Sequence, residues 1–152
     1  MGSVLAGGSA VVRRPLHVLV VDDNPEDLLL AEIAFGEQRE PYQLTTAVSG
    51  EAALRALDRL DVRGPDLILL DIHMPGMDGF EVLRQIKGNR AWRGIPVVML
   101  STSDEHVDIR RAYENQASAY LVKQDHPTRM AEQFARLLSF WAGARLTHWP
   151  DL

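Results

Sequence analysis

Short apolar runs alternate with longer helical segments along the chain from Leu16 onward. The apolar runs have the length of strands, and they span residues 16–21, 43–48, 66–70, 96–100 and 119–122. Short apolar strands that alternate with helices are typical of a parallel sheet covered on both faces. The pattern therefore predicts five parallel strands.

A helical segment follows each predicted strand. Pro25, followed by Glu26 and Asp27, opens a helix over residues 25–40, and Ser49 can cap a second helix over residues 50–60. Three more helices are predicted over residues 79–89, 104–116 and 127–143. Right-handed crossovers then give an α/β fold, namely a (βα)₅ doubly wound, flavodoxin-like domain with the strand order 2-1-3-4-5. In that order the first and third strands are neighbours, and such folds bind ligands at the carboxyl ends of this pair.

The 152 residues suit one domain with an ordinary hydrophobic core. We expect residues 1–14, which carry no charge before Arg13, to form a disordered tail. Residues 15–143 are expected to form the domain. Residues 144–152 are expected to form a C-terminal extension related to dimerisation.

Composition narrows the range of partners and locations. The chain has 16 Lys and Arg against 21 Asp and Glu, a net charge of −5, which argues against a general nucleic-acid or anionic membrane surface. No apolar stretch reaches the roughly 20 residues that span a bilayer. The absence of cysteine excludes thiol catalysis and thiolate metal sites and fits a reducing compartment, so a cytoplasmic location is expected.

Three carboxylates follow the two neighbouring strands. Asp22 and Asp23 come directly after the first strand and Asp71 after the third, so the fold brings them together. Crowded carboxylates repel one another, and a hard divalent cation relieves that repulsion, with Mg²⁺ the best fit. We expect Asp23 to bind Mg²⁺ directly, Asp22 directly or through water, and the backbone carbonyl of His73 to contribute a further ligand together with Asp71.

Donor groups follow two other predicted strands. Ser101 ends the fourth strand region and Lys123 follows the fifth. A hydroxyl and an ammonium beside a carboxylate supply hydrogen bonds that phosphoryl oxygens require. Asp71 is therefore predicted to be a nucleophile that forms an aspartyl phosphate, with Ser101 and Lys123 donating hydrogen bonds to the phosphoryl oxygens.

Four sequence blocks resemble those of the response regulator receiver domain. They are Asp22-Asp23, Asp71 with Met74-Pro75-Gly76-Met77-Asp78-Gly79, Pro96-Val-Val-Met-Leu-Ser101, and Ala117-Ser-Ala-Tyr120-Leu-Val-Lys123. This resemblance implies that Asp71 accepts phosphate from a histidine kinase or phosphotransfer protein and that Asp22 and Asp23 bind Mg²⁺. It also implies that Ser101 and Lys123 contact the phosphoryl group and that Tyr120 changes rotamer.

Further motifs resemble stand-alone regulators associated with bacterial phytochromes, which act as dimers. They are Asp23-Asn-Pro-Glu-Asp-Leu, Leu100-Ser-Thr-Ser-Asp104, and a tail from Phe140-Trp141 to Leu146-Thr-His-Trp-Pro150. A bacteriophytochrome is therefore one candidate kinase. Gln124 stands where most receivers have a proline after a cis peptide, so a trans bond is expected there. His73 occupies a position that in many receivers influences the access of water to the phosphoryl group.

Two helices carry more apolar side chains than one core face needs. Val107, Phe140 and Trp141 are candidates for a homodimer surface on the fourth and fifth helices. Leu29, Leu30 and Ile33 on the first helix are candidates for docking the phosphodonor. Scattered apolar surface residues and a wide core face are the respective alternatives.

Two other functions remain open from the sequence. A haloacid-dehalogenase-type phosphatase also uses a strand-end aspartate and Mg²⁺, but that family has an acid where His73 stands, and it needs cap insertions. A dimeric scaffold that works without phosphorylation is the other alternative, although the intact Asp22, Asp71 and Lys123 argue against it. We expect a switch and no enzyme beyond slow loss of its own phosphate.

Overall fold

Five parallel strands form one sheet in the order β2-β1-β3-β4-β5, in a computed structural model that describes residues 15–60 and 64–144. The strands are β1 (Leu16–Val21), β2 (Tyr42–Ala47), β3 (Leu67–Leu70), β4 (Val97–Ser101) and β5 (Ala119–Val122). The predicted fold class and strand order are confirmed. The predicted boundaries of β2, β3 and β4 are each wrong by one residue at one end or both.

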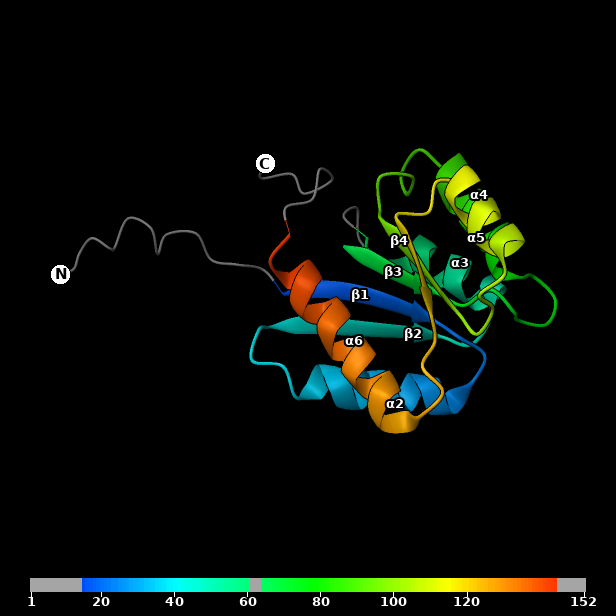
Figure 1. The fold of residues 1–152 in the computed structure, drawn as a ribbon. Coiled ribbons are helices and arrows are strands. Elements are labelled where there is room, and N and C mark those ends of the chain that lie inside the picture. The colour runs from blue at the N-terminus through cyan, green and yellow to red at the C-terminus, as the bar shows by residue number, and fades with distance from the viewer. Residues whose placement is uncertain (1–14, 61–63, 145–152) are drawn as a thin grey trace.

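Five helices cover the two faces of this sheet (Figure 1). They are α2 (Pro25–Gly36), α3 (Gly50–Arg59), α4 (Gly79–Gly88), α5 (His106–Glu114) and α6 (Pro127–Ala142). Helices α2 and α6 lie on one face, and α3, α4 and α5 lie on the other. Within the described ranges, none of these helices has the length and apolar character to cross a membrane.

Helix boundaries differ from the prediction where polar groups stop the helix. Helix α2 ends at Gly36 and not near residue 40, because the chain turns there, with the Gln38 amide bonded to the Phe35 carbonyl. Helix α5 begins two residues later than predicted, at His106, since the Ser103 hydroxyl accepts a hydrogen bond from the Glu105 amide. It ends at residue 114 because Gln116 adopts a positive φ of 72°. The predicted ends of α3, α4 and α6 are each one residue too long.

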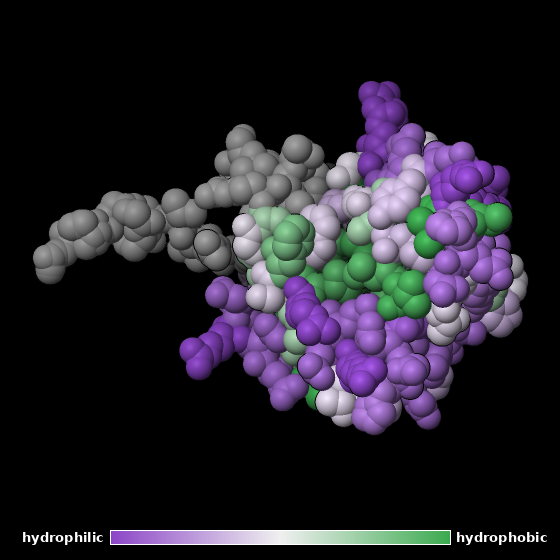
Figure 2. Space-filling view, in the orientation of Figure 1, coloured by the Kyte–Doolittle hydropathy of each residue, from purple (hydrophilic) through white to green (hydrophobic). Residues whose placement is uncertain are grey.

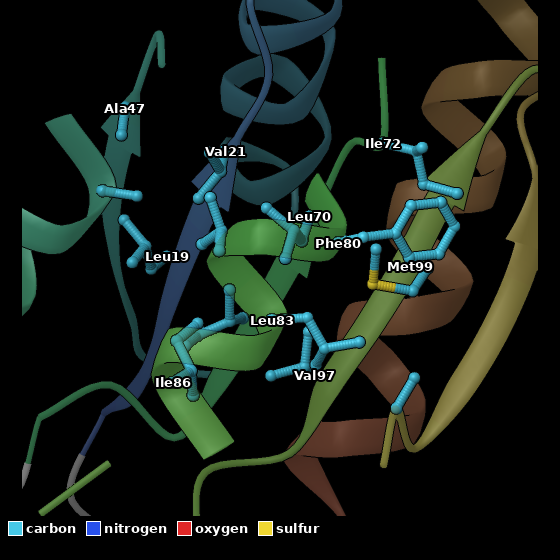
Figure 3. Packing of buried hydrophobic residues seen from close by; sticks show 14 of the residues in the cluster. Leu19, Val21, Ala47, Leu70, Ile72, Phe80, Leu83, Ile86, Val97 and Met99 are labelled. Atoms are coloured by element: carbon cyan, nitrogen blue, oxygen red, sulfur yellow. The ribbon is translucent and has the colours of Figure 1, made fainter. Parts of the chain in front are cut away.

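The strands are buried on both faces, so alternate residues enter two separate cores. Leu19 and Val21 pack against α3, α4 and α5, whereas Val18 and Val20 pack against α2 and α6. The first core is seen closely in Figure 3, which labels Leu19, Val21, Ala47, Leu70, Ile72, Phe80, Leu83, Ile86, Val97 and Met99. This double burial explains why β1, β3 and β4 read as continuous apolar runs.

Helices α2, α3 and α4 start with side-chain caps at the carboxyl edge of the sheet. The Asn24 side chain accepts a bond from the Glu26 amide, and the Ser49 hydroxyl accepts one from the Ala52 amide. The Asp78 carboxylate caps α4 in the same way. These caps fix the chain where β1, β2 and the loop after β3 leave the sheet.

Candidate functional site

The three predicted carboxylates lie together at the carboxyl edge of the sheet. Each of Asp22, Asp23 and Asp71 offers an oxygen, and these oxygens all lie within 4.8 Å of one another. The backbone holds two of them, because the Asp22 amide donates to Ala47 at 3.0 Å and the Asp71 amide donates to Val21 at 2.9 Å. Asp22 and Asp71 are buried, and Asp23 is exposed.

The start of α4 packs directly on the backbone of Asp71. The Gly79 amide donates a 2.8 Å hydrogen bond to the Ile72 carbonyl. A Cβ at Gly79 would lie only 2.2 Å from the Asp71 carbonyl oxygen and 2.7 Å from the Ile72 Cα. The contact therefore requires glycine, and it fixes the backbone on which the Asp71 side chain stands.

Lys123 reaches into the carboxylate cluster from the end of β5. Its Nζ lies 2.7 Å from Asp22 Oδ2, 2.8 Å from Asp27 Oδ2 and 3.5 Å from Asp71 Oδ1. The predicted convergence of Lys123 with the acidic residues is thus present in the structure. Asp27 was missed, because its place in the first turn of α2 is explained by the helix dipole alone. No pattern along the sequence marks it, because its contact with Lys123 depends on how α2 packs beside the end of β5.

Burial controls the charges in this cluster. Removal from water raises the pKa of Asp22 from 3.8 to about 7, although the hydrogen bond from Lys123 opposes that shift. Burial also raises the pKa of Asp71, again against the attraction of Lys123. For Lys123, burial would lower the pKa, but the hydrogen bonds to Asp22 and Asp27 outweigh it and raise the pKa. The ammonium therefore stays charged at neutral pH.

The donor set fits a hard divalent cation. Two buried carboxylates with raised pKa values resist ionisation together, and one ammonium shared with Asp27 only partly compensates them. Asp22, Asp23 and Asp71 present the oxygen ligands that Mg²⁺ prefers. The predicted contribution of the His73 carbonyl stays a prediction. The His73 ring is exposed, and its Nε2 lies 4.0 Å from Asp108 Oδ2 on α5.

Ser101 and Tyr120 lie on a chain of hydrogen bonds that leads toward α5. Ser101 is fully buried as the last residue of β4, and its hydroxyl accepts a 3.1 Å bond from the Ser103 amide. The Ser103 carbonyl accepts a 2.7 Å bond from the Tyr120 hydroxyl, and the Ser103 hydroxyl donates to Asp108 at 2.7 Å. Ser103 and Asp108, which sequence reasoning did not single out, thus connect the predicted switch residues to α5.

The main chain around Lys123 is fixed by its neighbours. The Lys123 amide donates a 2.7 Å bond to the Ser101 carbonyl, and the Gln133 amide group on α6 donates a 2.9 Å bond to the Val122 carbonyl. The part of the chain that the structure describes contains no cis peptide bond, so the Lys123–Gln124 bond is trans, as expected from the missing proline.

Apolar side chains are exposed on two surfaces. Val107 and Phe140 are 69% and 68% exposed, and Figure 2 shows hydrophobic surface in the middle of the face between α5 and α6. Trp141 is only partly buried, and its ring packs edge to face on Phe140 at 5.4 Å. On α2, Leu29 and Ile33 are exposed at 55% and 48%.

Leu30 differs from the other two candidates on α2. It is partly buried and packs against the core between α2, α6 and the sheet. The wide core face, which was the alternative to docking, therefore accounts for Leu30, whereas the exposed Leu29 and Ile33 remain candidates.

Comparison with known proteins places these features in a family. Residues 18–135 match the response regulator receiver domain, and the chain belongs to this family. It is 36% identical over 133 residues to the probable methanogenesis regulatory protein FilR2 of Methanothrix harundinacea, covering 85% of each chain. It is 32% identical over 131 residues to the response regulator Rcp1 of Synechocystis sp., covering 84% of this chain and 89% of Rcp1.

Solved structures give the same assignment. The phosphorylated cyanobacterial phytochrome response regulator RcpA superposes with a TM-score of 0.83 at 31% identity, covering 88% of this chain and 99% of RcpA. The Mn²⁺-bound form of Rcp1 superposes with a TM-score of 0.80 at 31% identity, covering 87% of this chain and 99% of Rcp1. The resemblance to receivers, including a phytochrome response regulator, is confirmed.

Proposed function

We propose that this chain is a phosphorylation switch in which Asp71 accepts a phosphoryl group from a histidine kinase or phosphotransfer protein. The observation that carries the proposal is the convergence on Asp71 of the two carboxylates that follow β1 and of the Lys123 ammonium, which lies 3.5 Å from Asp71 Oδ1. The relative RcpA, whose structure is of a phosphorylated form, supports it.

The chemistry is the transfer of one phosphoryl group. A carboxylate oxygen of Asp71 attacks the phosphorus of a phosphohistidine, a P–O bond forms, and the P–N bond breaks with its electron pair left on the imidazole. Lys123 and Ser101 donate hydrogen bonds to the phosphoryl oxygens. Asp22, Asp23, Asp71 and the His73 carbonyl would hold Mg²⁺, which supplies positive charge to the crowded oxygens when bound. The Mn²⁺-bound form of the relative Rcp1 supports the binding of a divalent cation.

We assign the first step of signal output to Ser101 and Tyr120. A phosphoryl group to which the Ser101 hydroxyl donates would draw that oxygen away from the Ser103 amide, whose hydrogen bond it accepts in the structure. Tyr120 is bonded to the carbonyl of the same Ser103. A shift at Ser103 would therefore change both the position of Tyr120 and the start of α5.

We assign the output surface to the apolar face between α5 and α6. Val107 of α5 and Phe140 of α6 are both exposed, and the Trp141 ring packs against the Phe140 ring. A homodimer through this face would remove these side chains from water. The expected contribution of residues 144–152 to a dimer falls, from residue 145 onward, outside the described residues, as does the expected tail 1–14. The domain limits 15–143 and the cytoplasmic location stay predictions.

We assign phosphodonor docking to the exposed side chains Leu29 and Ile33 on α2, which flanks the site edge and carries Asp27. The likeness to the phytochrome response regulator RcpA makes a bacteriophytochrome our candidate kinase. Its stimulus would then be light.

Small-molecule phosphorylation tests the proposal directly. The protein is incubated with Mg²⁺ and acetyl phosphate, and an acid-stable, base-labile adduct is sought by intact mass. We expect the adduct on the wild type, none on Asp71→Asn, and full labelling of the control Asp78→Asn, because asparagine also caps the helix α4. An unmodified wild type would leave the dimeric scaffold as the explanation, and rapid turnover of phosphate esters would favour a phosphatase.

A further inference from the structure

Asp27 is a fourth carboxylate at the site, and it has no role in the switch as described so far. It lies in the first turn of α2, and its side chain is 15% exposed. Its Oδ2 receives a hydrogen bond of 2.8 Å from Lys123 Nζ, across 96 residues of sequence. The contact is within 0.1 Å of the one that Lys123 makes with Asp22, at 2.7 Å.

The three N–H donors of the Lys123 ammonium are not used equally by the nearby carboxylates. A lysine ammonium has three N–H donors. Two are directed at Asp22 and Asp27 at full hydrogen-bond distance, and Asp71 Oδ1 lies beyond them at 3.5 Å. The third donor is thus available for an acceptor at Asp71, where the phosphoryl group would be attached.

The rest of Lys123 has little freedom to move. Its amide is bonded to β4, and the carbonyl before it is bonded to α6. Its side chain is 7% exposed. The direction of the ammonium is therefore determined mainly by the two carboxylates that hold it.

Of these two carboxylates, Asp22 is also a predicted ligand of the divalent cation. It is one of the three residues that present oxygens for a divalent cation. Asp27 does not belong to that group of three, so it can hold Lys123 while Asp22 is shared with a cation.

We infer that Asp27 is a positioning residue that holds the Lys123 ammonium toward Asp71 for phosphoryl transfer. The inference rests on the proposed function of Asp71. Asp27 acts through Lys123 and does not touch the reacting atoms.

The first test needs neither metal nor phosphate. In metal-free protein labelled with ¹⁵N-lysine, NMR measures how fast the Lys123 ammonium protons exchange with water. We expect Asp27→Ala to accelerate this exchange about tenfold, as the loss of a hydrogen bond between charged groups implies. Glu26→Ala removes the same charge from the same helical turn and is expected to leave the exchange rate unchanged. Equal exchange rates in the two variants would overturn the inference.

The second test measures the rate of phosphorylation by acetyl phosphate at saturating Mg²⁺. We expect Asp27→Ala to slow the reaction about tenfold, within the roughly 100-fold that a misplacement of about 1 Å can cost. A pure charge effect would act in the opposite direction, because removal of a negative charge favours the approach of an anionic donor. On a Lys123→Met background, Asp27→Ala is expected to have no further effect.

The outcomes separate the two proposals. A wild type without any adduct would contradict the proposed function, while the proton exchange would still report whether Asp27 holds Lys123. A labelled wild type with equal rates for Asp27→Ala and Glu26→Ala would overturn the inference and leave the switch intact. The same loss on the Lys123→Met background would also overturn it, because Asp27 would then not act through Lys123.

Discussion

The hydroxyl of Tyr120 donates a 2.7 Å hydrogen bond to the backbone carbonyl of Ser103. This bond joins the edge strand β5 to the loop between β4 and α5. It also fixes the orientation of an aromatic ring that the family resemblance identifies as a switch. In the state described here, the loop and the ring therefore hold each other in place.

Tyr120→Phe removes this bond and keeps the ring. Because the Ser103 carbonyl loses a neutral donor, we expect the free energy of unfolding to fall by about 0.5–1.5 kcal/mol. Phosphorylation of Asp71 is expected to remain, since the bond that Tyr120 loses is made to Ser103 and not to Asp71. Urea denaturation measures the first effect and intact mass the second.

Tyr42→Phe is the control for Tyr120→Phe. Tyr42 lies on β2, the edge strand opposite β5. Its ring packs edge to face on the Phe35 ring, with 5.7 Å between the ring centroids. Removal of its hydroxyl is expected to change stability less than removal of the Tyr120 hydroxyl. Equal losses in the two variants would contradict a specific role for the Tyr120–Ser103 bond.

The raised pKa of Asp22 predicts a pH dependence of stability in metal-free buffer. Its folded pKa of about 7 lies above the ordinary value of 3.8, so its contribution is complete below about pH 4 and is lost as the pH rises through about 7. Asp22→Asn stays neutral at every pH. The stability of this variant relative to the wild type is therefore expected to increase from pH 4 to pH 8, as measured by urea denaturation. Asp58→Asn, which removes an exposed carboxylate of α3, controls for the loss of one negative charge.

The same carboxylates make the effect of Mg²⁺ depend on pH. A cation must displace the protons of Asp22 and Asp71, whose pKa values are both raised by burial. The rise in melting temperature caused by excess Mg²⁺ is thus expected to be small at pH 5 and full at pH 8. A rise of equal size at both pH values, or one that persists after both Asp22 and Asp23 are changed to Asn, would exclude this metal site.

The sheet and its acidic edge could be predicted because both follow from local patterns. Strands buried on both faces read as apolar runs, and the parallel order brings together the residues that follow β1 and β3. Asp22, Asp23 and Asp71 were found in this way. The predicted end of α2 and the predicted start of α5 were wrong, since these boundaries depend on single polar contacts such as that of the Ser103 hydroxyl with the Glu105 amide.

Contacts between distant side chains could not be predicted. The bond from Lys123 to Asp27 depends on how α2 packs beside the end of β5, which no local pattern encodes. Leu30 shows the same limit, because the helical periodicity did not reveal that Leu30 packs against the core whereas Leu29 is exposed. The residues that carry chemistry were therefore easier to find than the residues that hold them in place.

The close contact at Gly79 predicts a cost for any side chain there. A Cβ would overlap the Asp71 carbonyl oxygen, so Gly79→Ala must push α4 away from the site. We expect a loss of about 1–3 kcal/mol or more in the free energy of unfolding and slower phosphorylation by acetyl phosphate. Gly88→Ala at the other end of α4 is the matched control, because nothing lies within 4 Å of its added Cβ. That variant is expected to be neutral or more stable by up to about 1 kcal/mol.

The two apolar surfaces predict different effects of two similar substitutions. Phe140→Glu places a charge in the proposed dimer face and is expected to raise the dimer dissociation constant about 30-fold or more, as the loss of a central apolar anchor does. Leu29→Glu places the same charge on the proposed docking surface of α2, where it is expected to slow transfer from a phosphodonor protein. Neither substitution touches the carboxylate cluster, so both variants should react normally with acetyl phosphate. Sedimentation with and without beryllofluoride measures the first effect, and labelling by a phosphorylated donor protein measures the second. Each variant is the control for the other. A wild type that stays monomeric with and without beryllofluoride would contradict the proposed dimer face. Equal transfer rates for the two variants would contradict the proposed docking surface.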